Sequence, residues 1–296
     1  MKLSGIFAAI TTPFDHNGDI YRVKIEHNLS RWNATSLAGY AVGTSAGEGV
    51  LLTHDERIAV FELSAKAAGE GRTLIADVSA EGVKEAAELA KHASGLGYHA
   101  VCARVPVHYS GLMFGAEAQA LFFRALGDRS PLPVIMLDDQ TWMGDDLAVS
   151  TLGKLSQHPN LAGVVESGSP IIGLKAILES VRPGFQVLAG SAPELWDSLK
   201  AGAHGAILPF AAAAPYGAIA VWEAFRTREE EAGQDWQDRI AQPSVLVTDL
   251  YGVAGLKYAM DLNGYYGGPP RLPLMPLSAE AKAEIATSFE GFSGKT

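Results

Sequence analysis

A short turn rich in glycine and hydroxyl side chains is the first segment whose residue types suggest chemistry. It spans residues 43–49, reads Gly-Thr-Ser-Ala-Gly-Glu-Gly, and joins a predicted strand to a predicted helix. Backbone N–H groups in such a turn can face an anion, and the hydroxyls of Thr44 and Ser45 can add hydrogen bonds. The turn is a candidate carboxylate pocket. The alternative is a plain tight turn that needs glycine for its backbone angles.

Carboxylates and an imidazole near the ends of other predicted strands suggest a second kind of site. Oxygen ligands and imidazole suit a hard divalent ion, which could stabilise an enolate. The alternative is that each carboxylate is a helix cap or a solvated side chain. The spacing favours no ligand set, so we expect neither a metal nor another cofactor. The candidate residues are Glu48, His108, Asp138, Asp139 and Glu166.

The elements that must position these residues follow a repeated βα pattern. Eight short apolar runs without polar alternation predict buried parallel strands, each followed by a stretch of helical spacing. Eight such units within about 225 residues match the size of a TIM barrel, an α/β fold whose active site lies at the carboxyl ends of the strands. The predicted strands are Gly5–Thr12, Gly39–Thr44, Thr73–Ser79, Ala100–Val105, Val134–Asp138, Leu161–Glu166, Phe185–Ala189 and Gly205–Phe210.

Helix signals support this division of the chain. Thr53 and Glu56 form a capping-box pattern, which predicts a helix over Asp55–Gly69. After residue 210 the pattern becomes helical only, apart from the Gly- and Pro-rich stretch 264–277, which predicts a crossing loop. We therefore expect a barrel at 1–223 and a C-terminal helical region at 224–296 that packs on it. The late helices are predicted at Tyr216–Arg228, Glu230–Leu250, Gly255–Asn263 and Ser278–Phe292.

Composition excludes several classes of protein. The 296 residues carry a formal charge of −10, which disfavours binding to nucleic acid or to an anionic membrane surface. The single cysteine, Cys102, allows no internal disulfide, and we expect it to be a small buried side chain. No targeting signal and no membrane-spanning run is evident, so we expect a cytoplasmic protein without nucleic-acid or membrane partners.

Several motifs together resemble the dihydrodipicolinate synthase and N-acetylneuraminate lyase family of pyruvate-handling (β/α)8 aldolases. That family works through a lysine Schiff base. The resemblance covers nearly the whole chain, and it implies carbon–carbon lyase chemistry on a small 2-oxo acid in a homodimer or homotetramer. The segments that carry it are 5–14, 43–48, 105–106, 132–135, 161–164, 187–191, 205–207, 255–259, 271–274 and 276–277.

The resemblance transfers some functional residues to this chain. Thr44 and Ser45 match the hydroxyl pair that holds the substrate carboxylate and relays a proton, although Ala46 is extra before Gly47. His108 lies near an aromatic hydroxyl position that the family exchanges between subunits. The substrate-binding residues implied are Thr44, Ser45, His108, Asp139, Gly190 and Ile207.

Two decisive family positions are occupied by hydrocarbon side chains. The relay tyrosine falls on Leu137 and the Schiff-base lysine on Val165. If both point inward, alternation turns Asp138 and Glu166 toward the helices and leaves Asp139 to face the barrel mouth. An imine needs a primary amine at the carbonyl carbon. No lysine replaces it, because those between residues 24 and 282 fall in predicted helices, Lys175 included.

Three hypotheses about function remain at this point. The first is a family member with a small 2-oxo acid pocket whose imine mechanism is lost or altered. The second is a non-catalytic paralogue that binds a ligand or assembles with an active homologue. The third is a metal-assisted aldolase or hydrolase built on the acidic candidates.

Overall fold

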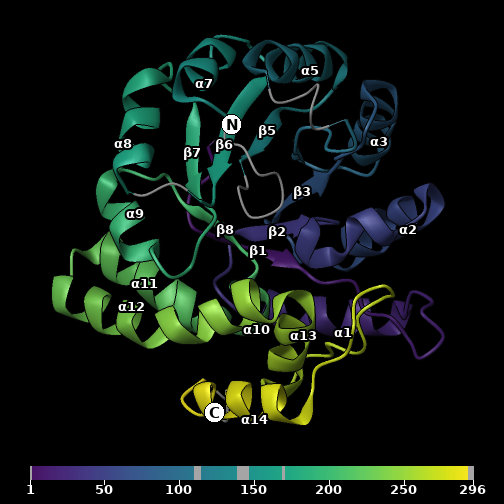
Figure 1. Ribbon diagram of the computed structural model, residues 1–296, viewed down its shortest axis with the longest axis vertical. Coiled ribbons are helices and arrows are strands. Elements are labelled where there is room, and N and C mark those ends of the chain that lie inside the picture. The colour runs from purple at the N-terminus through teal and green to yellow at the C-terminus, as the bar shows by residue number, and fades with distance from the viewer. Residues whose placement is uncertain (1, 110–114, 139–146, 169–170, 293–296) are drawn as a thin grey trace.

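The computed structural model describes residues 2–109, 115–138, 147–168 and 171–292. Eight parallel strands close into a barrel in chain order, with helices around the outside (Figure 1). The predicted TIM barrel is confirmed. The strands are β1 Ile6–Ile10, β2 Gly39–Val42, β3 Thr73–Asp77, β4 Ala100–Ala103, β5 Val134–Asp138, β6 Leu161–Glu166, β7 Gln186–Ala189 and β8 Ala206–Leu208.

Burial on both faces explains the composition of the strands. Nearly all strand residues are buried, since one face fills the barrel and the other packs against helices. Strands β5 and β6 have the predicted bounds, whereas the other six are one to three residues shorter than predicted. Leu137 pairs with Val165 across the β5–β6 ladder, so their side chains lie on the same face of the sheet.

The helices of the barrel alternate with its strands. The capping box is present: the Thr53 hydroxyl accepts from the Glu56 amide, and the Glu56 carboxylate accepts from the Thr53 amide. Cys102 is fully buried, as expected. The helices are α1 Arg22–Asn33, α2 His54–Ala67, α3 Val83–Gly95, α5 Ala116–Arg129, α7 Val149–Leu155, α8 Ile171–Ser180, α9 Leu195–Ala201, α10 Phe210–Ala213 and α11 Pro215–Thr227. Two 3₁₀ turns, η1 Ser45–Gly47 and η2 Gly49–Leu51, follow β2.

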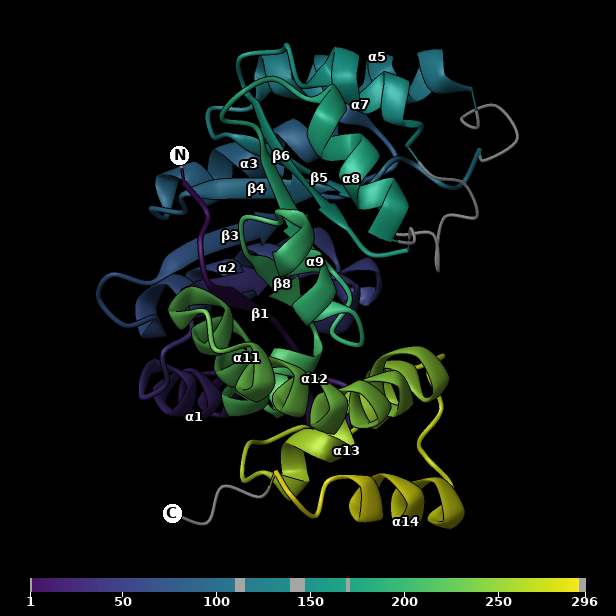
Figure 2. The same ribbon diagram turned by 90° about the vertical axis from the view of Figure 1, so that its left-hand side faces the viewer.

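The C-terminal region forms a helical layer against one side of the barrel (Figure 2). It contains α12 Glu230–Val245, the π-helical turn η3 Leu246–Leu250, α13 Gly252–Leu262 and α14 Ala279–Ser288. The predicted helix Glu230–Leu250 therefore changes its hydrogen-bond pattern at Leu246, shortly after Pro243, which cannot donate a backbone hydrogen bond. The short helix α10 was not predicted. The division proposed at residue 223 falls within α11, and it remains a prediction.

The described residues contain no helix with both the length and the apolar composition needed to cross a bilayer.

Candidate active site at the barrel mouth

The turn after β2 combines the two interpretations offered from sequence. Gly43 has a φ of +80°, and a Cβ on Gly49 would lie 1.8 Å from the Gly43 carbonyl oxygen, so both positions require glycine. Thr44 is 8% exposed, and its hydroxyl has no hydrogen-bond partner among the described residues. A buried hydroxyl without a protein partner is costly unless a ligand or water satisfies it. The turn is therefore tight and also presents a free polar group.

Glu48 holds this turn to the C-terminal region. Its φ of +56° is a left-handed conformation that few residues other than glycine adopt. Its carboxylate forms an ion pair with Lys257 on α13, at 2.5 Å between Oε1 and Nζ, with the two side chains 0% and 1% exposed. The other carboxylate oxygen accepts from the Arg271 amide at 2.7 Å. The strained turn is therefore stabilised by contacts with residues more than 200 positions away.

The Lys257 amine is not available as a nucleophile. Besides Glu48, it donates to the Pro269 carbonyl at 3.0 Å and lies 4.5 Å from the centre of the Phe14 ring. Burial lowers the pKa of Lys257 below its ordinary value, while the Glu48 carboxylate opposes that effect. Lys257 lines neither of the two cavities at the mouth.

Arg271 forms a second ion pair, with Glu56, beside the Glu48–Lys257 pair. Its guanidinium donates to both carboxylate oxygens of Glu56, each at 2.7 Å, and also to the Leu51 and Gly18 carbonyls. Hydrogen bonding from Arg271 lowers the pKa of Glu56 to about 2. We call Glu48, Glu56, Lys257 and Arg271 the latch, because they join the β2 turn and α2 to the C-terminal segment.

A central cavity of about 200 Å³ opens beside the β2 turn. Thr44, Ser45, Gly190 and Ile207, four of the six predicted substrate-binding residues, line it together with Leu137 and Val165. The cavity wall is therefore apolar at Leu137 and Val165. The full lining is Ala9, Thr44, Ser45, Ala46, Leu137, Val165, Ser167, Gly190, Ser191, Ala192, Ile207, Pro209, Phe210, Thr248 and Asp249.

Gly190 allows the β6 and β7 ends to approach closely. A Cβ at this position would lie 2.0 Å from the Ser167 hydroxyl and 2.9 Å from a Val165 methyl carbon. The Gly190 amide donates to the Glu166 carbonyl at 2.6 Å. Any larger residue here would therefore displace Ser167 or Val165 and change the wall of the central cavity.

The remaining predicted site residues lie elsewhere. His108 is exposed, its amide donates to the Glu81 carboxylate at 2.8 Å, and it does not line the central cavity. Asp139 lies outside the described residues. Asp138 and Glu166 are buried and accept hydrogen bonds from the Leu147 and Gly168 amides, and neither lines the cavity. Among the described residues, no group of three or more potential ligands could hold a metal ion.

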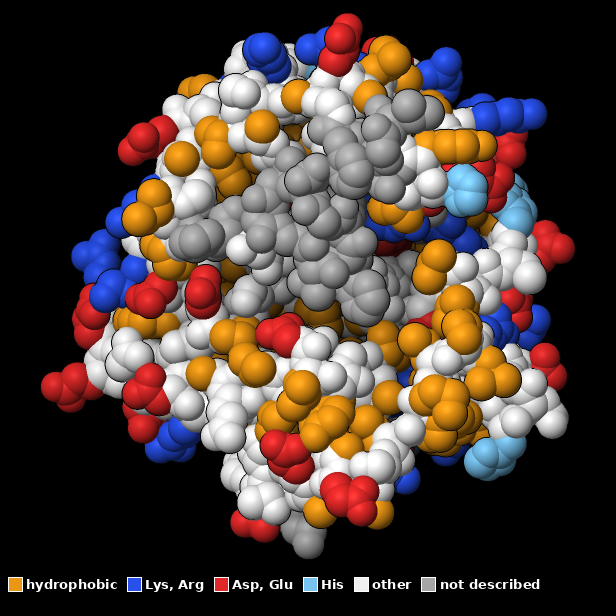
Figure 3. Space-filling model, in the orientation of Figure 1, with side chains coloured by type: hydrophobic (Ala, Val, Ile, Leu, Met, Phe, Trp, Pro, Cys, Tyr) orange, Lys and Arg blue, Asp and Glu red, His pale blue; other side chains and the backbone are white. Residues whose placement is uncertain are grey.

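A larger flanking cavity of about 590 Å³ lies on the other side of the β2 turn. Its charged residues come from the β2 turn, from α2 and from the ends of β3 and β4, and a hollow with blue and red side chains at its floor is visible to the right of centre in Figure 3. Arg57 donates to the Asp77 carbonyl at 2.6 Å and lies 3.7 Å from the Asp77 carboxylate. Burial lowers the pKa of Arg57 and raises that of Asp77. Arg104 lies 3.5 Å from the Glu81 carboxylate.

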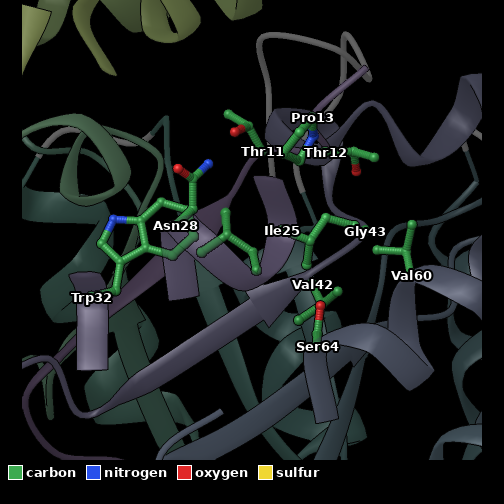
Figure 4. A pocket seen from close by; sticks show the side chains of 11 residues that line it. Thr11, Thr12, Pro13, Ile25, Asn28, Trp32, Val42, Gly43, Val60 and Ser64 are labelled. Atoms are coloured by element: carbon green, nitrogen blue, oxygen red, sulfur yellow. The ribbon is translucent and has the colours of Figure 1, made fainter. Parts of the chain in front are cut away.

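A third cavity is a packing void between β1, β2, α1 and α2 (Figure 4). Its volume of about 10 Å³ leaves room for at most one water molecule, so it is not a ligand site.

Sequence reasoning missed the functional importance of the late chain. Lys257 lies on the predicted C-terminal helix, α13, and is almost fully buried there. The only local signal was its position among apolar residues on a predicted helix, since a lysine inside an apolar face requires a buried partner. Thr248 and Asp249, which reach the central cavity from η3, were inside a predicted continuous helix and carried no recognisable signal.

Comparisons with known proteins identify the family and support the fold. Residues 2–290 match the model of the dihydrodipicolinate synthetase family. A 4-hydroxy-tetrahydrodipicolinate synthase from an Exiguobacterium species is 26% identical over 98% of each chain. The N-acetylneuraminate lyase of Proteus mirabilis has a TM-score of 0.89 and 25% identity, with 99% of this chain and 100% of that chain covered. A dihydrodipicolinate synthase from Acinetobacter baumannii, solved with pyruvate, has a TM-score of 0.92 and 22% identity, with 97% of this chain and 98% of that chain covered.

Proposed function

The chain belongs to the dihydrodipicolinate synthetase family, and from this premise we propose that it binds a small 2-oxo acid in the central cavity without forming an imine. Thr44 and Ser45 receive the carboxylate, and Leu137 and Val165 contact the carbon chain. Carbon–carbon lyase activity by the Schiff-base route is absent in this proposal, because the central cavity contains no amine among its described lining residues.

One observation carries the proposal. Val165 and Leu137 line the same cavity as Thr44, whose buried hydroxyl has no partner among the described residues. A ligand carboxylate that accepts from the Thr44 hydroxyl would remove the cost of this buried polar group. The hydrocarbon wall beside it would contact the carbon chain of the ligand without forming an imine. Lys175, the other lysine close to β6 in sequence, is exposed on α8 and does not line the cavity.

Reductive trapping tests the loss of imine chemistry. We expect pyruvate and borohydride to leave the intact mass of the wild-type protein unchanged. The double variant Val165→Lys and Leu137→Tyr should gain one adduct, located at position 165 by peptide mapping. An adduct on any lysine of the wild-type chain would contradict the proposal. The double variant serves as the positive control for access of pyruvate to the cavity.

Binding without chemistry is tested by calorimetry with pyruvate and 2-oxobutyrate. We expect dissociation constants in the millimolar range or below for the wild type and weaker binding to Thr44→Val. If neither acid binds, the second hypothesis from sequence, a paralogue that assembles with an active homologue, becomes the better account.

The metal-assisted hypothesis has less support. The described residues bring no three potential ligands together, and Asp138 and Glu166 accept backbone hydrogen bonds away from the cavity. Chelator-treated and metal-loaded samples should bind 2-oxo acids equally. A difference between them would favour this hypothesis.

The family membership also leads us to propose a homo-oligomer. Light scattering on the purified chain should give the mass of a dimer or a tetramer, and a monomer at micromolar concentration would contradict this expectation.

A further inference from the structure

The charge of the central cavity is unusual for a pocket that receives a carboxylate. Asp249 is the one ionisable residue among its described lining residues. The residues outside the described ranges between positions 110 and 170 include no lysine, arginine or histidine. Therefore neither the described lining nor those segments supply a cation to this cavity.

Four cationic side chains around the β2 turn already have carboxylate partners. Lys257 and Arg271 are paired with the carboxylates of Glu48 and Glu56 in the latch. Arg57 and Arg104 line the flanking cavity, which shares Thr44 and Ser45 with the central cavity, and they lie 3.7 and 3.5 Å from the carboxylates of Asp77 and Glu81. Moving one of these cations toward the central cavity would leave a partly or fully buried carboxylate without its partner, which is strongly unfavourable.

Asp249 borders the central cavity and can contact a ligand there. It is exposed and lies on the π-helical turn η3, a type of irregularity that is frequent at functional sites. One carboxylate oxygen accepts a hydrogen bond from the Thr248 hydroxyl at 2.8 Å. The other oxygen has no partner among the hydrogen bonds of the described residues and can accept from a ligand.

A simple anion in this cavity would meet repulsion from Asp249 with no compensating cation. A ligand that carries its own ammonium group removes this conflict, because the ammonium can pair with Asp249 while the carboxylate accepts from Thr44 and Ser45. The apolar wall of Leu137, Val165 and Ile207 then contacts the carbon chain.

We propose that the preferred ligand of the central cavity is a short aliphatic amino acid, bound non-covalently as a zwitterion. This inference rests on the proposed function for the location of the carboxylate, and it goes beyond that function in naming the ammonium group and its partner, Asp249. No bond is formed or broken in this binding step.

Calorimetry with five ligands of the same carbon skeleton tests the inference. The ligands are 2-aminobutyrate, 4-aminobutyrate, butyrate, 2-oxobutyrate and butylamine. We expect at least one aminobutyrate to bind at least 10-fold more tightly than butyrate, 2-oxobutyrate and butylamine. The variant Asp249→Asn should reduce this preference to about 2-fold or less while leaving the affinity for butyrate equal or improved. Asp238→Asn removes a carboxylate of α12 that pairs with Gln234 outside the cavity, and it should keep the preference.

The outcomes separate this inference from the proposed function. If 2-oxobutyrate binds as tightly as both aminobutyrates, the inference is wrong and the 2-oxo acid proposal stands. If butylamine binds as tightly as the aminobutyrates, the carboxylate contact is wrong. If none of the five ligands binds, both proposals fail. A preference that survives Asp249→Asn would also overturn the inference, since another group would then recognise the ammonium.

Discussion

The two sides of the β2 turn differ in whether their polar side chains have partners within the protein. On the flanking side and in the latch, the charged side chains of Glu48, Lys257, Glu56 and Arg271 have partners within the protein. On the central side, Asp249 is the one ionisable residue among the described lining residues, and the hydroxyl of Thr44, which borders both cavities, has no partner among the described residues. Ion pairs therefore mark the structural support here, whereas a buried hydroxyl without a described partner marks the candidate ligand site.

The largest effect expected from a single change is in the latch. Replacing Lys257 with Met leaves the Glu48 charge buried without its ammonium partner, which should lower the free energy of unfolding by about 3–5 kcal/mol. Urea denaturation at pH 7 measures this loss. Lys175→Met on the exposed face of α8 is the matched control and should change stability by less than about 0.5 kcal/mol.

Adding Glu48→Gln to Lys257→Met should recover part of that stability, because the unpaired buried charge is removed. If the double variant is as unstable as the single one, the loss came from packing around Lys257 and the role given to the ion pair is wrong.

A smaller effect on stability is expected for the ion pair between Glu56 and Arg271. Glu56→Gln should lower the free energy of unfolding by about 1–2 kcal/mol at pH 7, because it weakens a charge-assisted hydrogen-bond pair that solvent partly screens. Hydrogen bonding from Arg271 lowers the pKa of Glu56 to about 2 from its ordinary value of 4.5, so this contribution is complete above pH 4.5 and is lost as the pH falls toward 2.

Thermal unfolding between pH 5 and pH 2 should therefore show a steeper loss of stability for the wild type than for Glu56→Gln. Parallel curves would show that Glu56 has an ordinary pKa in the folded protein and that this ion pair is weak.

The central cavity should tolerate a polar replacement that the adjacent core does not. Val165→Thr can direct its hydroxyl into the cavity and should cost about 1 kcal/mol or less, whereas Val164→Thr, fully buried on the opposite face of β6, should cost about 1–3 kcal/mol. Chemical denaturation of the two variants measures the difference. Equal costs would indicate that Val165 is packed as core and does not face the cavity.

The smallest effect on stability is expected for Thr44→Val. Its hydroxyl has no described partner, so the unfolding free energy should change by less than about 0.5 kcal/mol while ligand affinity falls. Thr12→Val is the matched control. It removes a hydrogen bond to the Gly47 carbonyl at 2.6 Å and should cost about 1 kcal/mol. A stability loss at Thr44 as large as that at Thr12 would mean that the Thr44 hydroxyl is satisfied in the free protein.

The barrel could be predicted from sequence because its signals are local. Each strand is an apolar run, and the capping box at Thr53 marks a helix start within four residues. Likewise, the resemblance predicts that Val165 occupies the family's lysine position on β6, and alternation along the strand assigns Val165 and Glu166 to opposite faces.

The latch could not be predicted because its members are distant in sequence. Glu48 and Arg271 are 223 positions apart, and no local pattern pairs one with the other. The position of His108 relative to the cavity could not be predicted for a related reason, since the loop after β4 is shaped by contacts with Glu81 and not by strand periodicity. Short-range patterns specify elements, while the pairing of buried charges depends on how those elements pack.

The distance of Lys257 and Arg271 from Glu48 along the chain also has a consequence for biosynthesis. A ribosome completes all eight strands about 50 residues before it adds Lys257, so the nascent barrel carries the Glu48 carboxylate with no counterion for that interval. In fragments that end before residue 257, the β2 turn should therefore be disordered, and proteases should cleave it readily. The contacts that hold Glu48 in the folded turn can form only after residues 257 and 271 have been translated.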